Sequence, residues 1–249
     1  MLPYIEWTTI QAGSLTVHVW GLFVALGYLL GSHVSTKIVK QRGDDPKILW
    51  DLLGWLVIAG LIGGRIGHVL LYEPWYFFSH PSEILAIWHG GLSIFGGFIA
   101  CVFVGAWFLH QRRVNVLRYA DAIVFGLPFG LWIGRIGCFL IHDHPGIESD
   151  FYLAVTFPDG VTRHDLGLYL SLNGLLMGLV FLWLARKKRP IGTYITVFLI
   201  WYGIVRFGLD ALRLDDVRYY TLTPAQYLSL ALVAFGAFVA IHLRNQHHN

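Results

Sequence analysis

Residues 49–71 read LWDLLGWLVIAGLIGGRIGHVLL, a run of 23 residues in which Asp51 and Arg65 are the only acidic and basic side chains. A helix that crosses the hydrocarbon core of a bilayer needs about 20 mostly apolar residues. Because lipid offers the backbone no hydrogen-bond partner, this run predicts a membrane-spanning helix. The run also contains Gly63, Gly64 and Gly67. Small residues of this kind let helix backbones approach closely, so we expect a compact helix bundle.

The composition of the whole chain agrees with this segment. Of the 249 residues, 56% are hydrophobic, 16% are aromatic and only 13% are charged. Soluble domains carry roughly 25% charged residues, so too few polar side chains remain to cover a soluble globule. This composition excludes disorder, a coiled coil and a nucleic-acid-binding protein. Cys101 and Cys138 lie in apolar runs or at their ends and form no disulfide framework.

Windows of about 20 residues identify seven candidate spans, and we expect an all-α polytopic membrane protein with seven transmembrane helices. The expected spans are residues 14–36, 49–71, 84–109, 119–141, 168–185, 192–211 and 224–243. We expect residues 1–249 to form a single transmembrane domain with a small extracytoplasmic loop region at about 142–167. In that loop, residues 151–161 alternate weakly in polarity, which predicts a short hairpin around Pro158, Asp159 and Gly160.

The basic residues predict the orientation of the chain. Twelve of the 18 lie on one side of the predicted spans, between spans one and two, three and four, five and six, and after span seven. The opposite loops hold Arg163, Arg213 and Arg218. By the positive-inside rule, the N-terminus is expected outside and the C-terminus in the cytoplasm.

Three arginines, Arg65, Arg135 and Arg206, fall inside predicted spans. Each costs about 2.5–3.5 kcal/mol on membrane-insertion scales, so such residues face a polar cavity or pair with anions. Each could instead snorkel to the headgroups or pair with Asp121 or Asp210. All three lie within helical reach of the outer face, which favours a shared anion site.

Two of these arginines lie in similar segments. GRIGH at residues 64–68 and GRIGC at residues 134–138 both place glycines beside an arginine near the outer end of a span. The glycines open space around the guanidinium, whose planar donors suit bidentate pairing with phosphate. The alternative is close helix packing with an incidental arginine.

A polar cluster follows Arg135. It comprises Cys138, His142, Asp143 and His144, with His164 at the end of the same loop. Three interpretations remain open: a zinc site, which lacks a specific ligand spacing; a Cys138 nucleophile with a histidine base; and a general-base histidine beside phosphate-binding arginines. The third accounts for the most residues, and we expect neither a metal nor a cofactor.

Several segments resemble the prolipoprotein diacylglyceryl transferases. They are GRIGHVLLY (64–72), HPSEIL (80–85), WHGGLS (88–93), GRIGCF (134–139), YGIVRFGLDALR (202–213) and LTPAQYLS (222–229). Together they extend over most of the chain. The family also implies seven spans, with the N-terminus outside.

The resemblance implies a reaction and roles for residues. The family transfers the diacylglyceryl group of phosphatidylglycerol to the thiol of a lipobox cysteine in a prolipoprotein signal peptide, and glycerol phosphate leaves. By resemblance, Arg135 and Arg206 hold the phosphate. The catalytic candidates are Arg135, Arg206, His142, Asp143, His144 and His164. The substrate-binding candidates are Trp20, Arg65, Cys138, Gly146, Tyr202, Asp210 and Arg213.

The sequence departs from the family at several polar positions. Phe95 stands where the family has histidine, Cys138 where it has asparagine, and Trp20 where it has tyrosine. Asp143 and Asp210 replace glutamates. The resemblance therefore predicts a multi-pass transferase of the bacterial inner membrane that uses phosphatidylglycerol. A diverged enzyme with another acceptor, or a non-catalytic phospholipid-binding or anion-transport protein, is the alternative.

Overall fold

The computed structural model describes residues 1–71, 74–86, 90–214, 218 and 220–248. Two compact units divide the chain: the first comprises residues 1–38 and 120–249, and the second comprises residues 39–119. Each unit is described by itself.

Helices make up most of the described chain. The helices of 18 or more residues are α1 (Val19–Gln41), α2 (Pro46–Leu71), α4 (Ile94–Gln111), α5 (Val116–Ile141), α6 (Leu166–Leu184), α7 (Thr193–Asp210) and α8 (Pro224–His248). Each overlaps one expected span. Five of them, α1, α2, α5, α6 and α8, are long and apolar enough to cross a membrane. The chain is therefore a multi-pass membrane protein, while seven spans and the sides of the termini stay predictions.

Two expected helix starts were wrong. The first span was expected from residue 14, but Leu15–His18 form strand β3 and the helix begins at Val19. The third was expected from residue 84, but Pro81–Leu85 form the short 3-10 helix η1, and α4 begins only after Ser93. The Ser93 hydroxyl accepts a hydrogen bond from the Gly96 amide, which caps α4 and fixes its start. Apolar composition alone does not reveal a helix cap, so it placed the start of this helix too early.

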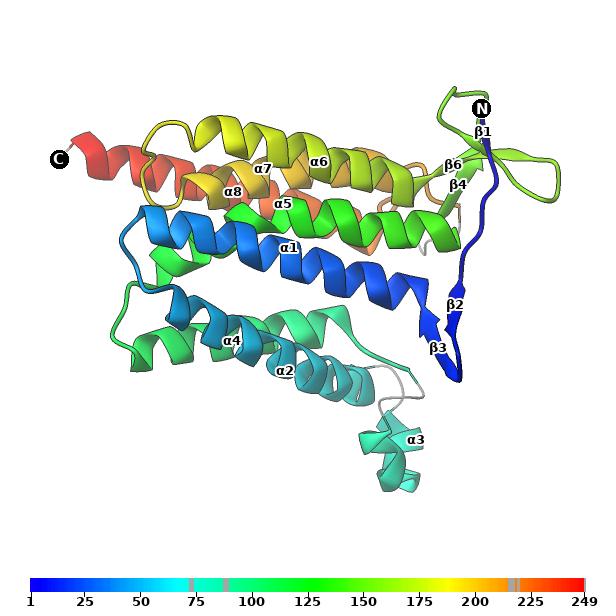
Figure 1. Cartoon of the computed structure of the whole chain (residues 1–249), viewed down its shortest axis with the longest axis horizontal. Coiled ribbons are helices and arrows are strands. Elements are labelled where there is room, and N and C mark those ends of the chain that lie inside the picture. Colours follow the sequence, from blue (N-terminus) through cyan, green and yellow to red (C-terminus); the bar gives the residue numbers. More distant parts are fainter. Residues whose placement is uncertain (72–73, 87–89, 215–217, 219, 249) are drawn as a thin grey trace. The chain divides into compact units, whose positions relative to one another are not determined.

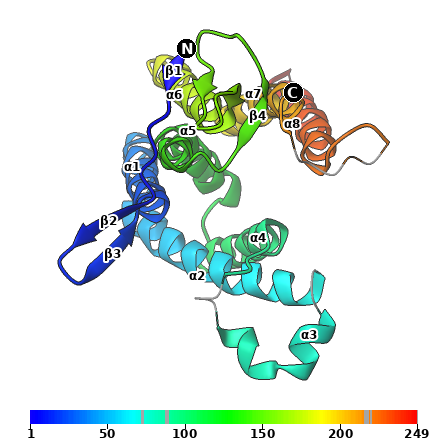
Figure 2. The ribbon, with the colours of Figure 1, turned by 90° about the vertical axis from the view of Figure 1, so that its right-hand side faces the viewer.

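The first unit carries two small sheets, of which only the hairpin at residues 151–161 was expected. β2 (Thr9–Ala12) and β3 form an antiparallel hairpin. β1 (Leu2–Pro3), β5 (Val155–Thr156), β6 (Thr162–Asp165) and β4 (Pro145–Glu148) form a sheet in that order. In this unit the strands lie at one end of the helices and the C-terminus at the other (Figures 1 and 2). The expected hairpin around Pro158 is confirmed, with β5 and β6 as its strands.

In the first unit, α1 and α5 pack through glycine. A Cβ on Gly27 would lie 2.6 Å from the Gly130 carbonyl oxygen, and one on Gly31 would lie 3.0 Å from that of Gly126. These four glycines recur every four residues on each helix, so they line one face of each. The two backbones meet where any larger side chain would separate them.

The second unit is built on α2 and α4. A Cβ on Gly67 would lie 2.7 Å from the Gly96 Cα, so these helices also cross in backbone contact. After α2 come the short helix α3 (Pro74–Ser79) and η1. Trp75 and Phe78 of α3 are largely exposed, whereas Phe77 is buried.

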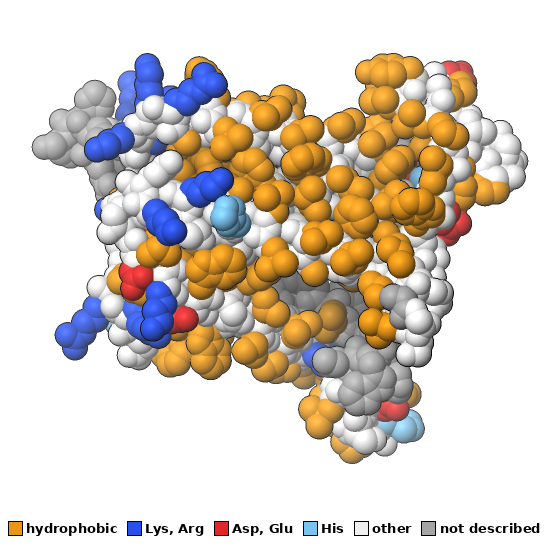
Figure 3. Space-filling model, viewed as in Figure 1, with side chains coloured by type: hydrophobic (Ala, Val, Ile, Leu, Met, Phe, Trp, Pro, Cys, Tyr) orange, Lys and Arg blue, Asp and Glu red, His pale blue; other side chains and the backbone are white. Residues whose placement is uncertain are grey.

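Apolar side chains also cover much of the outer surface. Leu172, Leu176 and Leu179 of α6 are each more than two-fifths exposed. In the first unit, hydrophobic side chains cover the flanks of the helices, and Lys and Arg gather at the end opposite the strands (Figure 3). An apolar band with a basic end is typical of helices that stand in lipid.

Candidate active site

The last turns of α7 carry three of the expected residues on one face. Tyr202, Arg206 and Asp210 recur every four residues, so they lie above one another along the helix. The Tyr202 ring stacks on Phe198, with ring centroids 5.3 Å apart. This stacking holds the tyrosine against its own helix, one turn before Arg206.

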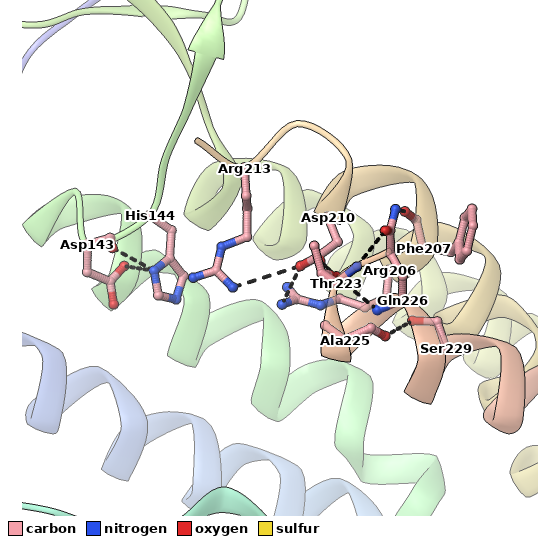
Figure 4. Close-up of polar contacts among 10 residues, drawn as sticks. All are labelled: Asp143, His144, Arg206, Phe207, Asp210, Arg213, Thr223, Ala225, Gln226 and Ser229. Atoms are coloured by element: carbon pink, nitrogen blue, oxygen red, sulfur yellow. Dashed lines mark hydrogen bonds and ion pairs between the residues drawn. The ribbon is translucent and has the colours of Figure 1, made fainter. Parts of the chain in front are cut away.

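Asp210 is the centre of a cluster of charges. Its carboxylate is completely buried, and Oδ1 lies 3.0 Å from Arg206 Nη2 and 3.8 Å from Arg213 Nη1. The two arginine side chains are 15% and 26% exposed, so each side chain keeps a solvent-accessible part. Two cations share one carboxylate, and this leaves an excess of positive charge. Figure 4 shows Arg206 and Arg213 converging on Asp210.

Strand β4 connects this cluster to the loop after α5. Gly146 forms a β-bridge with Arg213, and the Ile147 amide donates to the Leu212 carbonyl at 2.8 Å. A Cβ on Gly146 would lie 2.7 Å from the Leu212 carbonyl oxygen, so only glycine fits this contact without displacement. The segment from Asp143 to Gly146 is thereby fixed beside Arg213.

His144 makes its polar contacts with the described residues through one ring nitrogen, Nδ1. Its Nδ1 lies 2.6 Å from the Asp143 carbonyl oxygen, and the Asp143 carboxylate is 3.7 Å away. A carbonyl only accepts, so Nδ1 carries the proton and Nε2 of the neutral ring is an acceptor. The side chain is 28% exposed. Figure 4 shows the pair beside Arg213.

His142 lies in a different environment. Its side chain is 2% exposed, with Nδ1 2.7 Å from Asp165 Oδ2 and Nε2 3.2 Å from the Ile5 carbonyl oxygen. Both ring nitrogens of His142 thus have a partner within the fold. The ring also stacks on Tyr4 at 4.3 Å. His142 has φ +49°, and this left-handed conformation turns the chain at the end of α5.

The His164 side chain is also packed against neighbouring aromatic side chains. Its Nδ1 lies 2.7 Å from the Tyr169 hydroxyl, and the ring is tilted against Phe151. Burial lowers the pKa of His164 below its usual value, because desolvation disfavours the charged ring. Among the polar contacts of the described residues, both ring nitrogens of His142 have partners, whereas His144 and His164 each have a partner at Nδ1 alone. Figure 4 shows His144 beside Arg213.

Arg135 lies on α5, with Nη1 3.6 Å from the Cys138 sulfur. Among the described residues, no atom outside the surrounding turns of α5 lies within 4 Å of where a Cβ on Gly134 would be, which fits the open space expected beside this arginine. The other flanking glycine, Gly137, packs against α1, where the Trp20 Cα lies 3.3 Å from its Cβ position. Trp20 and Cys138 therefore lie near the C-terminal end of α5, with Trp20 half-exposed and Cys138 buried.

Arg65, in the second unit, has its donors occupied. Its guanidinium donates to the carbonyl oxygens of Glu83, Ile84, Gly90 and Gly91 at 2.5–3.1 Å. The Phe77 ring lies 5.0 Å from its central carbon. These contacts favour a structural role for Arg65, which holds η1 and the glycine pair before α4. Tyr72, Trp88 and His89, which contribute to the resemblance, lie outside the described residues.

Sequence reasoning missed three buried polar residues near the site: Asp165, Thr223 and Gln226. A Thr-x-x-Gln pattern before an apolar run is a recognisable helix-capping signal, so Thr223 and Gln226 had a local signature. Asp165 had none, since its partner His142 lies 23 residues earlier. Among the described residues, no three His, Cys, Asp or Glu side chains come together to hold a metal ion.

Comparison with known proteins gives one consistent result. The model of a family described as prolipoprotein diacylglyceryl transferase matches residues 8–242. Similar relatives come from Roseobacter denitrificans (30% identical over 98% of this chain and 96% of the relative), Bordetella avium (35%, over 86% and 84%) and Staphylococcus xylosus (32%, over 96% and 90%). Each relative is named phosphatidylglycerol–prolipoprotein diacylglyceryl transferase.

Proposed function

Because the chain belongs to the prolipoprotein diacylglyceryl transferase family, we propose that it transfers the diacylglyceryl group of phosphatidylglycerol to the thiol of a prolipoprotein. The acceptor is the lipobox cysteine of a signal peptide, and glycerol phosphate is released. The observation that carries this proposal is the Arg206–Asp210–Arg213 cluster. It presents two partly exposed arginine side chains and a net positive charge at the outer end of α7.

The chemistry assigns a task to each group. Arg206 and Arg135 bind the phosphate and stabilise the charge that develops on the leaving group. Arg213 adds a second cation on Asp210, and Tyr202 and Gly146 shape the site around them. Trp20 and Cys138, at the outer end of α5, line the approach of the lipid.

His144 is the general base of this mechanism. Its Nε2 takes the proton of the cysteine thiol, and the resulting thiolate is the nucleophile. The sulfur forms a bond to the terminal glyceryl carbon while the bond from that carbon to the phosphate oxygen breaks. The proton then passes to glycerol phosphate. Asp143 holds the tautomer of His144 through its carbonyl, and His142 and His164 maintain the loop.

The protein acts in the bacterial inner membrane, with seven spans in one transmembrane domain. The N-terminus and the 142–167 loop are outside, and the C-terminus is in the cytoplasm. Basic residues at the end opposite the strands support this orientation in the first unit (Figure 3).

The test is transfer of labelled diacylglycerol from phosphatidylglycerol to a lipobox peptide by the purified protein. Wild type and Arg135→Ala are compared, and both lipidated peptide and released glycerol phosphate are measured. We expect both products from wild type and a large loss in the variant. Glycerol phosphate without lipidated peptide would indicate another acceptor. Neither product, from folded protein that binds phosphatidylglycerol, would indicate a binding or transport protein.

A further inference from the structure

The N-terminus of α8 carries a complete capping box. The Gln226 amide donates to Thr223 Oγ1 at 3.1 Å, and the Thr223 amide donates to Gln226 Oε1 at 3.0 Å. Pro224 occupies the first helical position, where its missing N–H costs nothing. Both capping side chains are buried. The box fixes the start of α8, and it also makes contacts that helix capping does not require.

Those additional contacts reach the last turn of α7. A threonine hydroxyl has one hydrogen to donate, and that of Thr223 goes to Asp210 Oδ2. The Gln226 side-chain amide donates to the Phe207 carbonyl at 3.2 Å. The start of α8 is thus attached twice to the turn that carries Arg206 and Asp210 (Figure 4).

Because of the Thr223 hydrogen bond, the two carboxylate oxygens of Asp210 have different partners. Oδ2 binds the hydroxyl, and Oδ1 is left to face Arg206 and Arg213. Rotation of the carboxylate would break the hydrogen bond in a site without water access, since Asp210 is completely buried. A buried acceptor left without its donor is costly, so the hydroxyl keeps the carboxylate in one orientation.

We propose that Thr223 is a positioning residue for diacylglyceryl transfer. Its hydroxyl orients the Asp210 carboxylate, and the carboxylate in turn orients the Arg206 guanidinium toward the phosphate of the lipid. This inference rests on the proposed function, in which Arg206 binds that phosphate. Thr223 itself touches no substrate.

The test compares Thr223→Val, Thr223→Ser and Ser229→Ala for kcat, for KM toward phosphatidylglycerol and for unfolding temperature in detergent. Valine keeps the shape and removes the hydroxyl, whereas serine keeps the hydroxyl. Ser229 is the matched control, because it is equally buried on the same helix and its hydroxyl donates only to the Ala225 carbonyl within α8.

We expect Thr223→Val to lose roughly tenfold or more in kcat/KM, as for a hydrogen bond to a charged group, chiefly in kcat. Thr223→Ser and Ser229→Ala should stay within about twofold of wild type, since both leave the bond to Asp210 intact. Equal losses in Thr223→Val and Ser229→Ala, or no recovery with serine, would overturn the inference.

A second pair of variants separates capping from positioning if Thr223→Val does not fold. Asparagine and aspartate both cap helices well, but at neutral pH only the asparagine amide can donate to Asp210. Thr223→Asn should retain activity and Thr223→Asp should lose at least about tenfold; equal activity would contradict the inference. Inactive wild-type protein would instead count against the proposed function.

Discussion

A guanidinium has five N–H donors in a fixed plane, and its partners decide what it can still bind. Arg65 donates to four backbone carbonyls, so it holds a loop. Arg206 faces a single carboxylate oxygen and is partly exposed, so it can bind a further anion. From the sequence, the positions of Arg65, Arg135 and Arg206 within predicted spans suggested the same role, anion binding, for all three. The sequence could not distinguish a structural arginine from an anion-binding one, because the carbonyls that surround Arg65 come from residues 18–26 positions away.

Replacing Arg135 or Arg206 with lysine should lower kcat/KM by on the order of 100-fold or more. Lysine keeps the charge but loses the fork of donors that binds phosphate in two places. The measurement is lipidation of the lipobox peptide at varied phosphatidylglycerol. Lys187→Ala serves as the control, because Lys187 is exposed in the loop after α6. Near-normal turnover in both lysine variants would remove the phosphate-binding role.

The histidines near the site also differ by their partners, and this gives a second prediction. His144→Ala should lower kcat by about 100-fold or more, the range for loss of a general base. Lipidation of the lipobox peptide at saturating phosphatidylglycerol measures kcat. His110→Ala, an exposed histidine at the end of α4 in the second unit, should leave kcat unchanged. An unaltered kcat in His144→Ala would exclude this base.

At the scale of elements, the sequence predicted where helices run but not where they begin. Apolar length is imposed by lipid, so each long helix overlaps its expected span. The starts at Val19 and Ile94 depend on strand pairing and on the Ser93 cap. Hydropathy likewise could not predict the contact between α8 and α7. The Thr223 hydroxyl and Asp210 are 13 residues apart in sequence, so no local pattern links them.

The crossing of α2 and α4 gives a prediction with a matched control on one helix. Gly67→Ala places a methyl group 2.7 Å from the Gly96 Cα and should destabilise the protein by about 1–3 kcal/mol. In the part of the chain that the structure describes, Gly54→Ala meets no atom within 4 Å outside its own helix backbone, and it should be neutral or stabilising by up to about 1 kcal/mol. Denaturant titration in detergent measures both. Equal effects would show that the crossing is looser than the structure indicates.

For the whole molecule, the placement of charge predicts the orientation. In a variant whose Cys101 and Cys138 are replaced by alanine, Asp159→Cys lies in the loop between β5 and β6, before α6, and Lys187→Cys lies in the loop that follows α6. An impermeant maleimide added to spheroplasts should label residue 159 directly and residue 187 only after the membrane is opened. The reverse pattern would invert the topology.

The glycine contacts between α1 and α5 have a consequence for how such a chain can diverge. Positions that face lipid, such as Leu172 or Leu176, can exchange one apolar residue for another, because a fluid solvent adapts to any shape. Gly27, Gly31, Gly126 and Gly130 have no such freedom, since each faces a backbone atom of the other helix. Related sequences can therefore drift over most of their outer surface while the two helices keep one fixed separation. The spacing of α1 and α5 is thus set by positions that must stay glycine.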